Sequence, residues 1–282
     1  MHLGRHKAAR ETWLPKFSDR AAANDWRCDV KIHQFPCLSD NFGVLLHDSG
    51  TGITAAIDAP EEAAVLKALA DTGWTLDEIL VTHRHPDHVQ GIPALKARFN
   101  CKVTAPVGAA DAVPDADRLV SEGDVVEVGS LKADVLHMPG HCADHVCYHF
   151  AANKLIFVAD VLFALGCGRV FDEAYDDMWR SLSRLATLPD ETVAYFGHEY
   201  TVSNGRFALS VDPDNAALKA QVARHIALRA DNKPTSPTLL GDEKAANPFL
   251  RATDPAMAAR LGMAGKPAAA VFRELRERKN RF

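Results

Sequence analysis

Hydrophobic residues in the first two thirds of the chain fall in short runs, whereas those of the last third recur at helical spacing. Between about residues 29 and 200 the runs span four to eight residues and are rich in Val, Ile, Leu and Phe, which predicts β-strands. Nine strands are expected, at 29–35, 42–48, 53–59, 78–83, 125–128, 131–138, 146–150, 154–160 and 192–196.

Helical periodicity interrupts these strands three times, at 61–73, 92–99 and 174–188. In the last of these segments Met178, Leu182 and Leu185 lie on one face, as expected of a helix that packs on a sheet. Strands alternating with helices that lie outside them indicate an α/β layered fold.

After residue 200 we expect no further strands. Three segments there have helical periodicity, at 214–230, 254–262 and 266–282, and a polar, proline-containing stretch joins the first two. The sequence therefore predicts an α/β body over residues 29–200 and a small helical C-terminal domain over 201–282. Residues 1–28 are expected to form an N-terminal extension.

Composition is that of a globular protein, with 282 residues of which 47% are hydrophobic. The net charge of −5 gives no overall attraction to nucleic acid or to an anionic membrane surface. No apolar run approaches the roughly 20 residues that span a bilayer. We therefore expect neither nucleic acid nor membrane as a partner.

Six cysteines are spread along the chain without a CxxC pair, which favours reduced thiols and a cytoplasmic location. Cys142 and Cys167 are interpreted as packing or loop residues. The first 27 residues are basic but lack the apolar core of a secretory signal. Two interpretations of them stay open, an organelle-targeting presequence and an unstructured extension or early start codon.

The segment THRHPDH, residues 82–88, places three histidines and an aspartate directly after an apolar strand. His83 and His85 are two apart, so in an extended segment they point the same way while Arg84 points elsewhere. Asp87 and His88 follow the turn at Pro86 and can face a second point nearby. One cation needs three or four such donors, so the loop indicates two metal ions, with zinc the natural match and iron or manganese also suited.

Three further candidate ligands each follow a predicted strand and can reach the same edge: His141, Asp160 and His198. A carboxylate among them could bridge two metals. Single histidines elsewhere are more often surface or core residues, which is our interpretation of His33, His47, His137, His149 and His225. His145 is intermediate, because it lies four residues after His141 and could hydrogen-bond only within its loop.

Together, THRHPDH, His141, Asp160 and His198 resemble the metallo-β-lactamase superfamily. The resemblance covers about residues 30–200 and implies an αββα sandwich, two sheets with helices outside, with a dinuclear site at one edge. Asp58, at the end of ITAAIDAP, matches the aspartate that orients the metal loop in that superfamily.

Four further segments resemble glyoxalase II, the hydroxyacylglutathione hydrolases: LFALGCGRVF (162–171), GHEYT (197–201), NPFLR (247–251) and LRERKNRF (275–282). The resemblance implies that one metal is held by His83, His85 and His141 and the other by Asp87, His88 and His198, with Asp160 bridging. It also implies that Asp87 and Asp58 serve catalysis, Asp87 either as a pure ligand or as a proton shuttle.

Contacts to glutathione are implied at Arg169, Phe171, Tyr200, Arg276 and Lys279. Phe171 stands where many relatives have Tyr, so a hydroxyl contact to the peptide is expected to be missing. Arg276 and Lys279 are three apart on a predicted helix and could bind two carboxylates of the tripeptide. The competing interpretation is a solvated basic helix end that suits the helix dipole.

The expected activity is hydrolysis of S-D-lactoylglutathione, or another 2-hydroxyacyl thioester of glutathione, to glutathione and D-lactate by a hydroxide that bridges the two metals. This reaction is the second step of methylglyoxal detoxification, and we expect a monomer.

Three alternatives remain, the first of which is another hydrolase of the metallo-β-lactamase fold. A glutathione persulfide dioxygenase of the same superfamily would use one iron and three protein ligands. A binding or structural protein would hold metals only for its fold, although such sites are usually closed and rich in cysteine.

Overall fold

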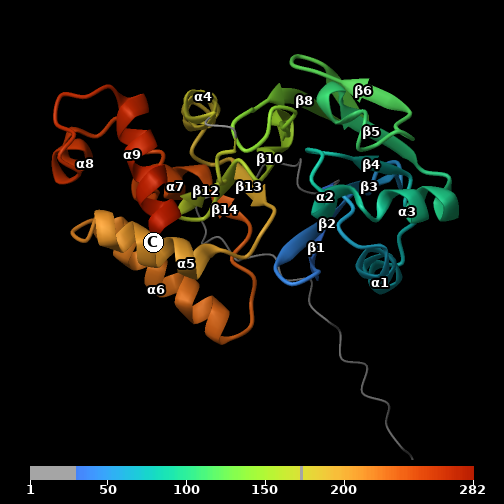
Figure 1. The fold of residues 1–282 in the computed structure, drawn as a ribbon. Coiled ribbons are helices and arrows are strands. Elements are labelled where there is room, and N and C mark those ends of the chain that lie inside the picture. Colours follow the sequence, from blue (N-terminus) through green and yellow to red (C-terminus); the bar gives the residue numbers. More distant parts are fainter. Residues whose placement is uncertain (1–29, 172–173) are drawn as a thin grey trace, which may run out of the picture.

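The computed structural model describes residues 30–171 and 174–282, so the expected extension over 1–28 lies outside the described residues. The described chain forms two six-stranded sheets that face each other, with helices against their outer sides (Figure 1). This arrangement confirms the αββα sandwich. All nine expected strands and all six expected helices are present, with ends that shift by a few residues.

The first sheet has the order β1-β2-β3-β4-β5-β6. Its strands are β1 (Val30–Cys37), β2 (Asn41–Asp48), β3 (Thr54–Ile57), β4 (Glu78–Leu80), β5 (Lys102–Pro106) and β6 (Arg118–Val120). β1 to β3 pair antiparallel, and β3 to β6 pair parallel through crossovers that contain α1 (Glu62–Thr72), α2 (Pro86–Val89) and α3 (Ile92–Phe99). Parallel pairing brings the carboxyl ends of β3, β4 and β5 to one edge.

The second sheet has the order β14-β13-β10-β9-β8-β7. Its strands are β7 (Val125–Val128), β8 (Leu131–His137), β9 (Val146–Phe150), β10 (Leu155–Ala159), β13 (Val193–Phe196) and β14 (Thr238–Leu239). The expectation that strands stop after residue 200 is wrong, because β14 pairs antiparallel with β13. Two residues are too few to show the alternation by which a strand is recognised in a sequence.

Alternate residues of the strands pack on opposite sides, as the pleat requires. Leu46 and Ile57 of the first sheet meet Val126 and Tyr148 of the second in a cluster between the sheets. Leu45 points the other way and packs with residues of α1 and α3. The strands are therefore apolar on both faces, which explains why they appear as short continuous runs.

The remaining helices are α4 (Tyr175–Ala186), α5 (Thr201–Val211), α6 (Ala216–Ala230), α7 (Leu240–Ala246), α8 (Pro255–Arg260) and α9 (Ala268–Arg281). Phe272 and Leu275 of α9 share one buried cluster with Leu182 of α4 and Ile156 of β10. Each large apolar side chain buried there contributes about 1.5–3 kcal/mol. The C-terminal helices, gathered beside the sandwich in Figure 1, thus share a core with the second sheet.

Several elements are not recognisable from sequence periodicity: β5, β6, β14, α2, α5, α7, the hairpin of β11 (Leu162–Phe163) and β12 (Gly166–Cys167), and two 3-10 turns at Val107–Ala109 and Ala151–Asn153. Most are very short. α5 is longer, but its sequence TVSNGRFALSV contains β-branched residues and a glycine, which disfavour a helix in isolation. Packing of Phe207 and Ala208 into the core stabilises it instead. Among the described residues, no helix has the length and apolarity needed to cross a membrane.

Candidate active site

Seven candidate ligands converge from both sheets at one edge of the sandwich. His83 and His85 follow β4, His141 lies between β8 and β9, Asp160 follows β10, and His198 follows β13. The other two, Asp87 and His88, lie in α2 rather than in an irregular loop. Pro86 occupies the first turn of that helix, where its missing N–H costs nothing.

The first group consists of His83, His85 and His141, whose ligand atoms all lie within 4.8 Å of one another. Nδ1 of His85 is 3.1 Å from Nε2 of His83 and 2.9 Å from Nε2 of His141. Arg84 turns away, because its backbone N–H donates to Asp144 and its guanidinium pairs with the same carboxylate at 3.2 Å. The alternation expected for residues 83–85 is therefore present.

The second group consists of Asp87, His88 and His198, also within 4.8 Å of one another. Nε2 of His198 lies 3.4 Å from both Nε2 of His88 and Oδ2 of Asp87. Asp160 lies between the two groups, with Oδ2 3.4 Å from Nε2 of His141 and 3.3 Å from Nε2 of His198. Its other oxygen, Oδ1, is buried without a hydrogen-bond partner. A buried carboxylate oxygen of this kind is costly unless a cation compensates it.

Outer partners fix the tautomers of the histidines. Nδ1 of His88 donates to Asp58 at 2.7 Å, Nδ1 of His198 to Asp40 at 2.8 Å, and Nδ1 of His141 to the carbonyl of Arg169 at 2.9 Å. With the ring neutral, each Nε2 then directs a lone pair into the cluster. The inward nitrogens of His88 and His198 lie 3.4 Å apart and His198 lies beside Asp160, so this set of imidazole and carboxylate donors fits divalent metal ions.

Asp58 connects the metal loop to its surroundings. It accepts hydrogen bonds from the backbone N–H and hydroxyl of Thr82, at 2.7 and 2.8 Å, as well as from His88. The Thr82 hydroxyl lies 3.0 Å from Nδ1 of His83, where it accepts the proton of that ring. Asp58 thus contacts His88 directly and His83 through Thr82, one histidine of each group.

Electrostatics differ between the two groups. Burial and neighbouring imidazoles hold the pKa of His83 well below its usual value, and burial also lowers the pKa of His85 and of His141. Burial opposes charge on His88 as well, but the carboxylates of Asp160 and Asp58 outweigh it and raise the pKa of His88 to about 9. The carboxylates around the second group therefore stabilise positive charge there.

Two features of the site carry no recognisable sequence signal. His145 is buried, its ring stacks on that of His83 at 4.7 Å, and its Nε2 accepts from the backbone N–H of Asp160 at 3.2 Å. It supports the cluster instead of only bonding within its own loop. Asp40, the last residue of the turn after β1, and Asn41, the first residue of β2, contact ligands more than 45 residues away, at His198 and Asp87.

The rim of the cluster carries three of the residues expected to bind glutathione. Phe171 is 42% exposed and its ring lies 5.4 Å from that of His141. Tyr200 is 39% exposed and stacks on His198 at 4.9 Å with the rings nearly parallel. Arg169 is exposed beside them.

The two residues of α9 that are expected to contact glutathione, Arg276 and Lys279, are placed differently from each other. Arg276 is only 6% exposed and its guanidinium donates to the carbonyl of Cys167 at 3.0 Å, so it fixes the hairpin of β11 and β12. The ammonium of Lys279 lies 3.3 Å from the carbonyl and hydroxyl oxygens of Ser203. Burial and the charge of Arg276 lower the pKa of Lys279 to about 8. The competing interpretation, a solvated basic helix end, therefore does not hold for Arg276, which is buried.

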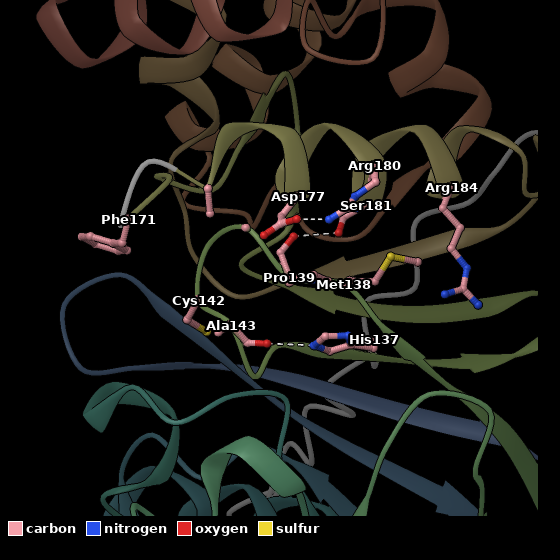
Figure 2. A pocket seen from close by; sticks show the side chains of 12 residues that line it. His137, Met138, Pro139, Cys142, Ala143, Phe171, Asp177, Arg180, Ser181 and Arg184 are labelled. Atoms are coloured by element: carbon pink, nitrogen blue, oxygen red, sulfur yellow. Dashed lines mark hydrogen bonds and ion pairs between the residues drawn. The ribbon is translucent and has the colours of Figure 1, made fainter. Parts of the chain in front are cut away.

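A cavity of about 540 Å³ adjoins the rim. Figure 2 shows Phe171 and Cys142 at one end and Arg184 of α4 at the other. Arg184 forms two hydrogen bonds with Glu122, at 2.8 and 2.7 Å, and Arg180 pairs with Asp177. Both guanidinium groups are thus already paired with carboxylates, and none of the seven candidate ligands lines this cavity.

A two-sheet sandwich with His and Asp clusters at its edge defines a metal-binding α/β protein whose site fits two divalent ions. Residues 40–198 match the family model of the metallo-beta-lactamase superfamily, and residues 199–282 match that of the hydroxyacylglutathione hydrolase C-terminus. The chain belongs to the hydroxyacylglutathione hydrolases of the metallo-beta-lactamase superfamily, which confirms the resemblance to glyoxalase II.

Individual relatives agree with this assignment. The chain is 57% identical over 253 residues to the hydroxyacylglutathione hydrolase of Bradyrhizobium sp. (strain ORS 278), which covers 90% of this chain and 98% of the relative. It is 54% identical to that of Rhizobium johnstonii over 90% of this chain and 99% of the relative. Among solved structures, ETHE1 from Myxococcus xanthus superposes with a TM-score of 0.64 at 28% identity, covering 89% of this chain and 91% of that one.

Proposed function

We propose that the protein hydrolyses S-(2-hydroxyacyl)glutathione thioesters, with S-D-lactoylglutathione as substrate and glutathione and D-lactate as products. The observation that carries this proposal is the cluster itself. Histidine nitrogens and the carboxylates of Asp87 and Asp160 form two adjacent groups at the sandwich edge, in a chain more than half identical to relatives named for this reaction.

Two zinc ions are proposed as the cofactors, one held by His83, His85 and His141 and the other by Asp87, His88 and His198, with Asp160 shared. Zinc suits a set of imidazole and carboxylate donors. Bound metal supplies a water molecule of lowered pKa and polarises the thioester carbonyl. The inward nitrogens of the histidine rings support this arrangement, as does Oδ1 of Asp160, which is buried without a hydrogen bond and lies 3.6 Å from Nε2 of His88.

The side chains nearest the cluster favour water as the nucleophile. Burial raises the pKa of the Cys142 and Cys167 thiols, so neither is a thiolate at neutral pH. Asp87 is half-buried, and its pKa stays below the usual value because the positive field of His88 and a hydrogen bond from Asn41 outweigh burial. Asp87 is therefore ionised and can hold a cation or accept a proton during turnover.

Glutathione is proposed to bind across the rim between the cluster and α9. Arg169 and Lys279 provide positive charge for its carboxylates, and the rings of Phe171 and Tyr200 flank the thioester. Phe171 offers an apolar face without a hydroxyl donor. Arg276 contributes by holding the hairpin that precedes Arg169, through its bond to the Cys167 carbonyl.

The direct test follows loss of the thioester absorbance of S-D-lactoylglutathione, with metal analysis on the same sample. We expect turnover with two metal ions per chain, and loss of both in Asp160→Ala. His47→Ala is a matched control, because His47 lies at the opposite end of β2 from Asn41 and stacks on Trp74. A protein that holds two metals and leaves every glutathione thioester intact would contradict the proposal.

The dioxygenase alternative is less well supported by the site. A single iron with three ligands would leave the second group, Asp87, His88 and His198, without a purpose. Oxygen uptake with glutathione persulfide, and one iron per chain, would favour the dioxygenase instead.

The location and assembly are also proposals. We propose a cytoplasmic monomer, since the five cysteines of the described residues are all free and buried, which suits a reducing compartment. Light scattering on the purified protein tests the monomer, for which a mass near 30.7 kDa is expected.

A further inference from the structure

The last residue of the turn between β1 and β2 and the first residue of β2 contact the second group of candidate ligands through consecutive side chains. Oδ1 of Asp40 accepts from Nδ1 of His198 at 2.8 Å. The amide of Asn41, which is buried, donates to both the backbone carbonyl and Oδ2 of Asp87, at 3.1 and 3.0 Å. Two of the three residues in that group are thus held from outside by adjacent residues, Asp40 at the end of the turn and Asn41 at the start of β2.

Backbone contacts fix this turn against the end of β13. The N–H of Phe42 donates to the carbonyl of Gly197 at 2.8 Å, and the N–H of Glu199 donates to the carbonyl of Asp40 at 2.9 Å. Asn41 and His198 form an isolated antiparallel bridge between these two bonds. The side chains of residues 40 and 41 therefore approach their partners from a rigid base.

The two groups differ in what lies behind them. His83 and His141 donate outward to neutral oxygens, the Thr82 hydroxyl and the Arg169 carbonyl. His88 and His198 donate to carboxylates, Asp58 and Asp40. A carboxylate behind a histidine fixes its tautomer and makes its inward nitrogen a stronger donor to a metal.

We propose that Asp40 and Asn41 are positioning residues for the Asp87, His88 and His198 group. Asp40 orients His198 and increases the basicity of its Nε2, while Asn41 aims the carboxylate of Asp87. Neither residue needs to touch the substrate. This inference rests on the proposed two-metal function, and it assigns these two residues to one metal position only.

The test titrates the metal-free protein with Zn²⁺ in the presence of a competing chelator. We expect Asp40→Ala to weaken one of the two zinc equivalents by about 10- to 100-fold and to leave the other unchanged. Asp40→Asn keeps an oxygen that can accept from His198 but removes the charge, so it should restore part of the affinity. Asn41→Ala should weaken the same equivalent.

A second arm identifies the position affected. Combined with His198→Ala, which removes a ligand of the second group, Asp40→Ala should cause no further loss of zinc. Combined with His85→Ala, which removes a ligand of the first group, it should weaken the remaining ion.

Asp48→Asn is the matched structural control. Asp48 lies at the far end of β2, where its carboxylate accepts from Gly50, Thr51 and Ser130. This variant should lose stability but bind both zinc ions as the parent protein does.

The outcomes separate the two proposals. Fewer than two zinc ions in the parent protein would overturn the proposed function. Two ions in the parent, with unchanged affinities in Asp40→Ala, Asp40→Asn and Asn41→Ala, would overturn the positioning role alone. Equal weakening of both ions in all three variants would also overturn it, because the turn would then support the fold and not one metal position.

Discussion

At the scale of single residues, Glu243 shows what burial does to an ionisable group outside the site. Its side chain is buried and accepts from the backbone N–H of Leu165 at 2.8 Å, the Thr238 hydroxyl at 2.7 Å and the Asn247 amide at 3.0 Å. Burial nevertheless dominates and raises the pKa of Glu243 to about 7. This carboxyl thus connects α7 to the loop between β11 and β12, and its contribution to the unfolding free energy depends on pH.

Glu243→Gln should remove that dependence. Because the folded pKa lies above the unfolded value of about 4.5, the stability contributed by the protonated form is complete below pH 4.5 and is lost as pH rises through 7. Relative to the variant, the parent should lose about 3 kcal/mol of unfolding free energy between pH 4.5 and pH 8. Urea denaturation at several pH values measures this difference, and parallel curves would contradict it.

His145 gives a second prediction at this scale. Phenylalanine at position 145 can keep the stack on His83, but it leaves the backbone N–H of Asp160 without an acceptor. Loss of a buried hydrogen bond of this kind costs about 1–3 kcal/mol. We expect His145→Phe to lower both the unfolding free energy and turnover, since Asp160 moves with its backbone. Full turnover in a folded His145→Phe protein would show that the bond does not position Asp160.

At the scale of elements, the hairpin of β11 and β12 lies directly against the end of β10. Gly168 follows β12, and a Cβ at this position would lie 1.9 Å from the carbonyl oxygen of Asp160. Only glycine permits this approach, which places Arg169 beside His141.

Gly168→Ala should therefore separate the hairpin from the cluster. We expect a loss of about 1–3 kcal/mol in stability together with reduced metal binding and turnover. Gly123→Ala is the control, because its φ of +84° also disfavours alanine while nothing lies within 4 Å of the new Cβ. The control should lose stability and keep turnover; equal turnover in both variants would contradict the role of the close approach.

At the scale of the whole molecule, the C-terminal helices share a hydrophobic core with the second sheet. Phe272 of α9 packs within 5.9 Å of the ring of Trp179 in α4, and both contact the cluster that includes Ile156 of β10. Trp74, in contrast, packs against the first sheet and stacks on His47 at 4.4 Å. The two tryptophans thus report on opposite sides of the sandwich.

We expect the sandwich and the C-terminal helices to unfold in one transition. In proteins that keep only Trp74 or only Trp179, with the other three tryptophans changed to Phe, fluorescence should give the same denaturation midpoint. Phe272→Ala should lower both midpoints together, by about 3–5 kcal/mol in unfolding free energy. A midpoint that shifts only for Trp179 would show that the helices unfold on their own.

The sequence by itself determined the fold class, and it identified all seven candidate ligands of the cluster by their positions. Strands with two buried faces are recognised as apolar runs, and ligands at strand ends follow those runs directly, as THRHPDH follows β4. Asp58 is not one of these seven: it has no metal-ligand spacing, and only the resemblance implies its orienting role. These features are local, because burial and pleat act on neighbouring residues.

The tertiary structure decided what depends on distant partners. Asp40 meets His198 across 158 residues, and β14 and α5 exist because neighbouring elements pack on them. The structure also buries Arg276 against the hairpin, where the resemblance and the helical spacing predicted a contact to a glutathione carboxylate. Hydrogen bonds between remote segments leave no periodic trace in a sequence, so only folding reveals which side chains support the cluster and which can reach a substrate.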